Sequence, residues 1–130
     1  MVGAGDTVIH STDGGFTWAL QPPLLGQRHT WFGVSFLNGT LGCVCGNYGA
    51  VMCTADGGAS WTRQLSSALP SSVTLRSIAV LSGTRTVTVG DGDVVIRTDD
   101  AGVTWQASRP PYGMHLQVSQ SVELSLAVFK

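Results

Sequence analysis

Three cysteines lie close together near the middle of this 130-residue chain, and their spacing is the first hint of chemistry. Cys43, Cys45 and Cys53 could bind a metal ion through their thiolates, or could form a disulfide. No second cysteine pair follows to complete a tetrahedral site, so the sequence predicts no metal and no cofactor. The odd cysteine count favours reduced, buried thiols. A disulfide between Cys43 and Cys53 stays open, because these two residues could face each other on neighbouring strands.

Glycoside hydrolysis is the second chemistry that the residue types suggest. Sialidase-like enzymes hold a carboxylate with clustered arginines and use a tyrosine nucleophile with an acidic helper. The chain has six arginines and two tyrosines, but Glu123 is the one acid outside a repeated phrase and the hairpin turns. His10, His29 and His115 each stand alone, and no Gly-x-Ser-x-Gly sequence occurs. We therefore predict that the protein is not an enzyme.

A phrase containing an aspartate and a tryptophan occurs three times, as STDGGFTW, TADGGASW and TDDAGVTW. The copies share Ser/Thr-x-Asp-x-Gly-x-x-Trp, and their aspartates are spaced by 43 and 44 residues. In a tight turn an aspartate can accept backbone N–H groups, a hydroxyl can add a hydrogen bond, and a tryptophan ring can cover the turn. Glycine is expected where a β-carbon would clash. We predict structural, non-catalytic roles for Ser11, Asp13, Gly15, Trp18, Thr54, Asp56, Gly58, Trp61, Thr98, Asp100, Gly102 and Trp105.

The similarity extends beyond the phrase, because residues 30–54 and 74–98 align over 25 residues without a gap. Alternating apolar residues predict four short strands in each unit. Asn38-Gly39 predicts a tight hairpin turn, since both residues tolerate positive φ. GDGD at 90–93 could suggest a calcium or phosphate site, but the pattern first predicts another hairpin turn. A repeated four-stranded unit of this length is typical of a β-propeller blade. In the second unit the strands are expected near 31–36, 41–45, 50–54 and 61–64.

The repeat divides the chain into about three blade equivalents within one all-β segment, residues 1–130. Met1–Gly3 aligns with Val44–Gly46, so the first unit lacks its inner strands, whereas the C-terminal residues alternate like the first two strands of another blade. Three blades fall short of the four to eight that rings contain. A second copy or the remainder of a longer propeller is expected to complete the ring. The predicted divisions are a half blade at 1–21, blades at 30–65 and 74–108, and a half blade at 115–130.

These phrases resemble Asp-box (BNR) repeats, and AVLSGTRTVTVGDGDVVIRTDDAGVTW is similar to the photosystem II stability and assembly factor family of Asp-box propellers. The resemblance covers nearly all of the chain. It implies a non-catalytic β-propeller scaffold that binds other proteins, as an assembly or stability factor of a larger complex. Sialidases carry the same boxes, so the alternative is a carbohydrate-binding or sialidase-like glycoside hydrolase propeller.

A partner-binding face is expected where the loops between blades meet the turns between second and third strands. Arginine and aromatic residues are enriched in interface hot spots. Arg76 and Arg97 match arginines of the family pattern, but the second unit has Phe32 and Cys53 there, which breaks a continuous arginine patch. The alternative interpretation is solvated arginines and a packed tryptophan. The predicted partner-binding residues are Arg28, Trp31, Tyr48, Arg76, Arg109 and Tyr112.

Charge and hydropathy exclude other classes of partner. Net charge is −1 with seven scattered cations, so no basic surface for nucleic acid is predicted. No apolar run approaches the ~18 residues that span a bilayer. The N-terminal residues lack the pattern of a secretory signal, and a soluble chain is expected, with its compartment left open.

Overall fold

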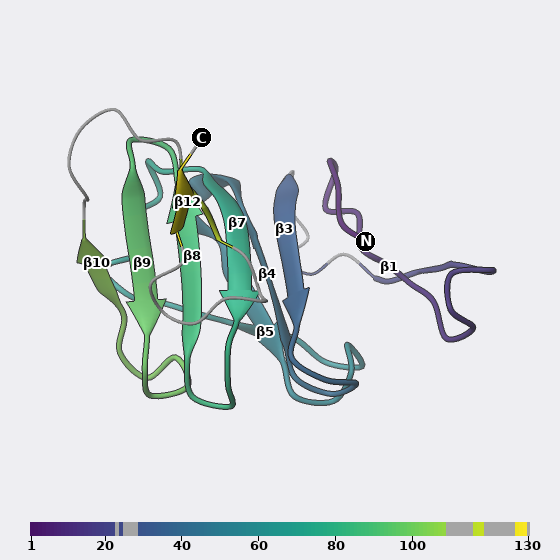
Figure 1. The fold of residues 1–130 in the computed structure, drawn as a ribbon. Coiled ribbons are helices and arrows are strands. Elements are labelled where there is room, and N and C mark those ends of the chain that lie inside the picture. The colour runs from purple at the N-terminus through teal and green to yellow at the C-terminus, as the bar shows by residue number, and fades with distance from the viewer. Residues whose placement is uncertain (23, 25–28, 109–115, 119–126, 130) are drawn as a thin grey trace.

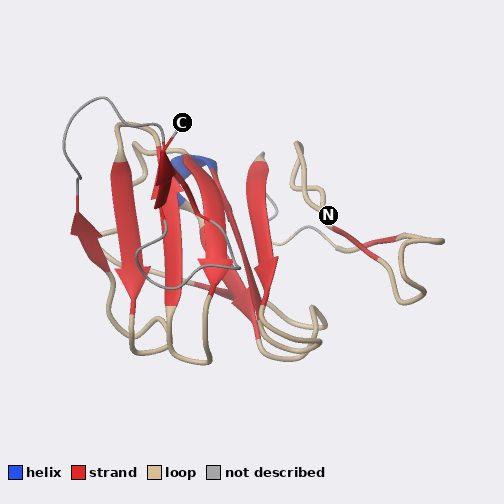
Figure 2. Ribbon diagram, viewed as in Figure 1, coloured by secondary structure: helices blue, strands red, loops and turns tan. Residues whose placement is uncertain are grey.

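The computed structural model describes residues 1–22, 24, 29–108, 116–118 and 127–129, which form short antiparallel strands (Figures 1 and 2). The prediction of an all-β, partial propeller is confirmed. The single helical element of the described residues is one 3₁₀ turn, η1 (Asn47–Gly49). None of the described helical residues forms a helix long and apolar enough to cross a membrane.

The first complete sheet is a four-stranded meander in the order β3-β4-β5-β6. Successive side chains along each strand point to opposite faces of the sheet, as the two-residue period of a strand requires. Val44, in the second strand, pairs with Val34 on one side and with Met52 on the other. The strands are β3 (Trp31–Phe36), β4 (Gly42–Gly46), β5 (Val51–Thr54) and β6 (Thr62–Arg63).

The second complete sheet repeats this arrangement 44 residues later, in the order β7-β8-β9-β10. Even the irregularity in the first strand recurs, because a register shift falls between Trp31 and Gly33 and again between Leu75 and Ser77. The strands are β7 (Leu75–Val80), β8 (Thr86–Gly90), β9 (Val94–Thr98) and β10 (Gln106–Ser108).

Two further strand pairs flank these sheets, with β1 (Ile9–His10) paired to β2 (Ala19–Leu20) and β11 (Leu116–Val118) paired to β12 (Ala127–Phe129). Val2 bridges to Val8, so the N-terminal residues lie alongside the first pair. In Figure 1, β1 lies beside β3 at one end of the stack, and β12 overlies the second complete sheet at the other.

The main hydrophobic core lies between the two complete sheets, where β7 packs against β3 and β4. A hydrogen bond crosses this interface, with the Val80 backbone N–H donating to Ser35 Oγ at 2.8 Å. Face-to-face packing of successive four-stranded sheets is the arrangement of propeller blades. The buried core side chains here are Cys43, Cys45, Val51, Leu75, Ile78, Val80, Val94, Ile96 and Trp105.

The two hairpin turns differ from each other. Between β8 and β9, Gly92 and Asp93 have φ of +74° and +57°, which confirms GDGD as a hairpin turn. Neither Asn38 nor Gly39 has positive φ, so the predicted tight turn of that geometry is wrong. Instead Asn38 Oδ1 accepts hydrogen bonds from the backbone N–H groups of Thr40 and Leu41, both at 2.8 Å, and the side chain itself shapes a longer loop.

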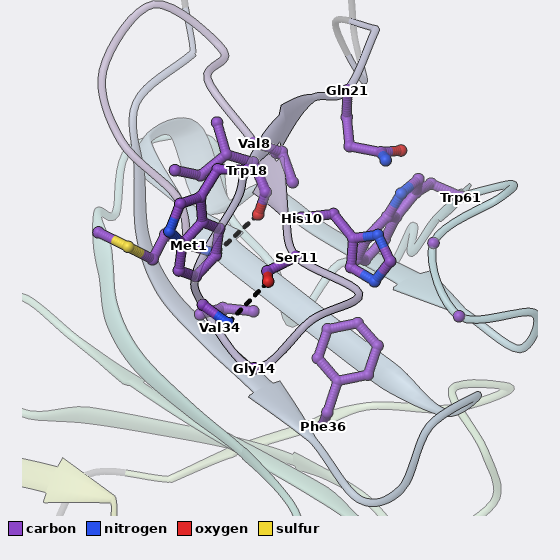
Figure 3. A pocket seen from close by; sticks show the side chains of 14 residues that line it. Met1, Val8, His10, Ser11, Gly14, Trp18, Gln21, Val34, Phe36 and Trp61 are labelled. Atoms are coloured by element: carbon purple, nitrogen blue, oxygen red, sulfur yellow. Dashed lines mark hydrogen bonds between the residues drawn. The ribbon is translucent and has the colours of Figure 1, made fainter.

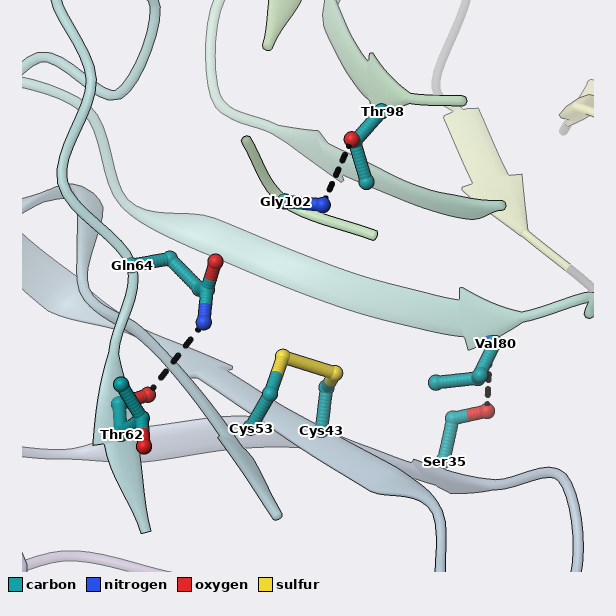
Figure 4. The surroundings of a disulfide bond; sticks show 8 residues. All are labelled: Ser35, Cys43, Cys53, Thr62, Gln64, Val80, Thr98 and Gly102. Carbon is teal, nitrogen blue, oxygen red and sulfur yellow. Dashed lines mark hydrogen bonds between the residues drawn. A yellow bond between two sulfur atoms is a disulfide. The ribbon is translucent and has the colours of Figure 1, made fainter. Parts of the chain in front are cut away.

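A disulfide joins Cys43 on β4 to Cys53 on β5, with a Cα–Cα distance of 4.1 Å (Figure 4). The two residues are direct partners in the β4–β5 register, so both side chains leave the same face of the sheet. The expectation of reduced thiols is therefore wrong for this pair. Cys45 remains a free thiol, and its burial raises its pKa to about 12.

Candidate functional site

The second Asp-box turn is closed by its own side chains. The Thr54 hydroxyl donates to Asp56 Oδ1 at 2.7 Å and accepts the Gly58 backbone N–H at 2.9 Å. Asp56 also accepts hydrogen bonds from the backbone N–H and the hydroxyl of Ser60. The same set of contacts forms around Ser11, Asp13, Gly15 and Thr17, and around Thr98, Asp100, Gly102 and Thr104.

Thr17, Ser60 and Thr104 are structural residues that the sequence reasoning missed. Each one donates both its backbone N–H and its hydroxyl to the box aspartate. The signal was present, because a hydroxyl residue precedes the tryptophan in all three phrases.

These hydrogen bonds stabilise the ionised form of the box carboxylates. The hydrogen bond from the Thr17 hydroxyl is the largest cause that lowers the pKa of Asp13 to about 2, and the one from Ser60 does the same for Asp56. The pKa of Asp100 is also lowered, first by Thr104. A carboxylate that is ionised at neutral pH and bonded within its own turn is poorly suited to act as a general acid.

The box glycines are required by backbone conformation. Gly15, Gly58 and Gly102 have φ of +95°, +94° and +88°. A β-carbon at Gly15 or Gly58 would meet the tryptophan ring of its own box at ordinary contact distances of 3.5 and 3.6 Å. The predicted clash is therefore wrong at those two positions, where positive φ is what selects glycine.

The box tryptophans differ in burial. Trp105 is buried in the core between the two complete sheets, whereas Trp18 remains about half exposed. Trp61 packs beside the second core cluster, which includes Val44 and Met52.

Exposed aromatic and charged side chains gather near the turns that follow the second strand of each sheet. We call this surface the turn face and define it by Phe32, Tyr48, Arg76 and Asp91. Backbone hydrogen bonds fix these turns to the loops before β7. The Gly49 N–H donates to the Val73 carbonyl at 2.7 Å, and the Asp91 N–H donates to the Thr74 carbonyl at 2.9 Å. Tyr48 is exposed, and its ring is nearly perpendicular to that of His29, with the ring centres 5.7 Å apart.

Arg76 is the centre of the turn face. Its guanidinium makes two hydrogen bonds to the Asp91 carboxylate, at 2.9 and 3.0 Å, and lies 4.7 Å from the ring centre of Phe32. The hydrogen bonds from Arg76 lower the pKa of Asp91 and raise the pKa of Arg76. Both side chains are about half exposed, so an incoming carboxylate could compete with Asp91 for the guanidinium.

Trp31 is only 2% exposed, so the prediction that it contacts a partner is wrong for this structure. Its indole N–H donates to the buried carboxylate of Asp6 at 2.6 Å, and its ring stacks on His29 at 5.8 Å. The indole thus links the N-terminal segment to β3. Trp31 is therefore the packed tryptophan of the alternative interpretation.

Arg97, which matches an arginine of the family pattern, is not brought to this face. Arg97 on β9 pairs with Val87 on β8. Arg76 instead follows Leu75, which pairs with Gly90, three residues further along β8. The Arg97 guanidinium lies 3.5 Å from Asp99, so Arg76 and Arg97 form no continuous patch. Arg28, Arg109 and Tyr112 lie outside the described residues, as do His115 and Glu123.

Residues 1–117 match the family described as photosynthesis system II assembly factor YCF48. The chain belongs to the YCF48 family. A solved structure described as YCF48 bound to D1 peptide is 31% identical, with a TM-score of 0.72, and the alignment covers 82% of this chain and 34% of that one. YCF48 from Cyanidioschyzon merolae is 19% identical over 68% of this chain and 31% of that one, with a TM-score of 0.56, and shows the shared fold.

The chain spans about a third of the length of these YCF48 structures. No curated protein matches it closely enough to count as a relative.

Proposed function

We propose that this chain is a non-catalytic protein-binding scaffold that acts in photosystem II assembly and binds a peptide of the D1 type through the turn face. The observation that supports this most strongly is the 31% identical YCF48 structure, which is described as bound to a D1 peptide. The family match over residues 1–117 supports the assembly role.

The chemistry of the turn face suits a peptide that carries a carboxylate. Phe32 and Tyr48 are exposed aromatic side chains, and both flat rings can cover apolar peptide atoms at low entropic cost. Arg76 offers a planar guanidinium that can bind a carboxylate with two hydrogen bonds, in place of Asp91. A peptide carboxylate that displaces Asp91 would gain a charge-assisted pair beside an aromatic ring.

Catalysis is not needed for this function. The box carboxylates support a non-catalytic role, because each is hydrogen-bonded within its own turn.

We also propose that the ring is completed from outside the described strands, by a second copy or by the remainder of a longer propeller. The described strands form two complete sheets and two flanking pairs, which is fewer blades than a ring needs.

The test is a titration of fluorescently labelled D1 peptide with the purified chain. Arg76→Gln keeps a polar side chain but shortens it and removes the guanidinium charge. We expect about a tenfold loss of affinity, which corresponds to about 1.4 kcal/mol, because the hydrogen bonds from the guanidinium to the peptide carboxylate are lost. Arg63→Gln, an exposed arginine on β6, serves as the matched control and should bind like the wild type. Equal affinities for the two variants, or saturable binding of sialic acid in place of the peptide, would refute the proposal.

A further inference from the structure

The Cys43–Cys53 disulfide lies on the wall of a cavity between the two complete sheets. The cavity has a volume of about 330 Å³, and both cysteines line it. Figure 4 shows the disulfide with Thr62 and Gln64 beyond Cys53. The residues around the cavity come from the two four-stranded sheets and from the turns that join their strands. The cavity is therefore a feature of two whole blades.

The two sulfur atoms of the disulfide differ in access. Cys43 is 5% exposed, whereas Cys53 is only partly buried. The sheets are closed beyond Cys43, because its partner on β3 is Ser35, which is 3% exposed and accepts the Val80 backbone N–H at 2.8 Å. Beyond Cys53, its partner Thr62 is exposed on β6, the edge strand of the sheet.

This asymmetry decides which sulfur a thiolate can reach. In thiol–disulfide exchange the incoming sulfur approaches the attacked sulfur from the side opposite to the leaving sulfur, and the rate depends on access. Attack on Cys43 would have to pass through the packed side chains of Ser35 and Val80. Attack on Cys53 comes from the exposed edge strand, so Cys53 is the reachable sulfur and Cys43 is the leaving group.

The rim of the cavity carries short, uncharged side chains. Such a rim leaves room for the backbone of another protein to come close to the Cys53 sulfur. The exposed residues of this rim are Ala55, Ser82, Gly83 and Ala101.

The repeat indicates that the sheet does not need the disulfide. The positions 44 residues after the two cysteines hold Val87 and Arg97. These two residues pair across β8 and β9 just as the cysteines pair across β4 and β5. In the first unit the counterpart of Cys53 is His10, which also faces a cavity beside the next sheet (Figure 3). The same sheet geometry thus forms without a covalent bridge at this position.

We propose that the Cys43–Cys53 disulfide is a reversible exchange site for a dithiol protein that carries a Cys-x-x-Cys motif of the thioredoxin type. A thiolate of that protein attacks the Cys53 sulfur, and the electron pair of the broken S–S bond passes to the Cys43 sulfur, which takes up a proton. The second thiol of the partner loses its proton and displaces Cys53 from the mixed disulfide, and Cys53 takes up a proton in turn. Two electrons and two protons reach this chain, and the partner leaves as a disulfide.

Cys45 takes no part in this exchange. It lies two residues from Cys43 on β4 and is 0% exposed. Its burial raises its pKa to about 12, so it supplies little thiolate to attack the neighbouring bridge. The exchange is therefore confined to one pair of cysteines and does not depend on the proposed peptide binding.

The first experiment incubates the native chain with thioredoxin, which its reductase and NADPH keep reduced. We expect one NADPH to be consumed per chain, because the couple transfers two electrons. Thioredoxin that lacks its resolving cysteine should be trapped as a mixed disulfide, and peptide mapping should place the bond on Cys53. A native chain that thioredoxin does not reduce, even if dithiothreitol reduces it, would overturn the proposal. A mixed disulfide on Cys43 would overturn it as well.

A pair of variants tests the route of attack. Thr62→Phe places a large ring beside Cys53, so reduction by thioredoxin should become about tenfold slower, since the exchange rate depends on access. Ala59→Phe is the matched control, because Ala59 is exposed and its counterpart in the first box is Phe16, which is 91% exposed. This control should be reduced at the wild-type rate. Equal rates for the two variants would contradict attack from the edge strand.

A double variant, Cys43→Ala with Cys53→Ala, tests whether the folded chain can exist without the bridge. We expect the circular dichroism of the wild type and no consumption of NADPH. Its melting temperature should equal that of the reduced wild type and lie below that of the oxidised chain, because the bridge restricts the unfolded chain. An unfolded double variant, together with loss of structure when the wild type is reduced, would overturn a reversible exchange in the folded protein.

Discussion

Thr54→Val isolates the structural role of the Asp-box hydroxyl. Valine has nearly the shape of threonine, but it cannot accept the hydrogen bond from the Gly58 backbone N–H. Thr54 is 5% exposed and that hydrogen bond is buried, so water has little access to replace it. Leaving a buried donor unsatisfied costs about 1–3 kcal/mol in the free energy of unfolding.

The matched control is Ser11→Ala in the first box. Ser11 makes the same contacts as Thr54, with its hydroxyl accepting the Gly15 N–H at 2.8 Å, but this box is exposed. Water can replace the lost acceptor there, so the loss of stability should stay below about 0.5 kcal/mol.

Urea denaturation at fixed protein concentration measures both variants, and thermal unfolding gives a second reading, at about 3–6 °C for each kcal/mol in a domain of this size. The reasoning fails if Thr54→Val is as stable as the wild type. It fails equally if Ser11→Ala loses as much as Thr54→Val, since burial is what should distinguish them.

Two further predictions concern acid and the cysteines. The box carboxylates have pKa values below the ordinary 3.8, near 2 for Asp13 and Asp56, so the stability they contribute is complete above about pH 4 and is lost as the pH falls towards 2. The melting temperature should therefore fall over that range, and it should fall less in Asp56→Asn; an identical pH profile for this variant would contradict the assignment. For the cysteines, a thiol assay in denaturant should find one free thiol without reductant and three after reduction, because Cys43 and Cys53 form a disulfide. Three free thiols in protein purified under oxidising conditions would contradict the bridge.

The repeat made most of the fold predictable from the sequence. The spacing of Asp13, Asp56 and Asp100 and the alternation within each unit were sufficient to predict four-stranded antiparallel sheets. The Asp-box contacts could be anticipated as well, because a short side chain hydrogen-bonded to its own turn depends on local sequence alone.

What the sequence could not supply depends on register and on neighbouring sheets. Cys43 and Cys53 are joined because β4 and β5 pair in one particular register, which an odd cysteine count does not reveal. Trp31 is buried because Asp6, 25 residues away, accepts its indole N–H. Asn38 shapes its loop through its own side chain, so the positive φ inferred from the Asn-Gly pair was not required.

The central claim is that the turn face binds a peptide while the Asp-boxes only brace the sheets, and an NMR titration of the isotope-labelled chain with D1 peptide tests it most directly. We expect the backbone amide signals of Phe32, Tyr48, Arg76 and Asp91 to shift as peptide is added, while those of Gly58 and Gly102 stay in place. Shifts centred on the box glycines, with the turn face unmoved, would contradict the account.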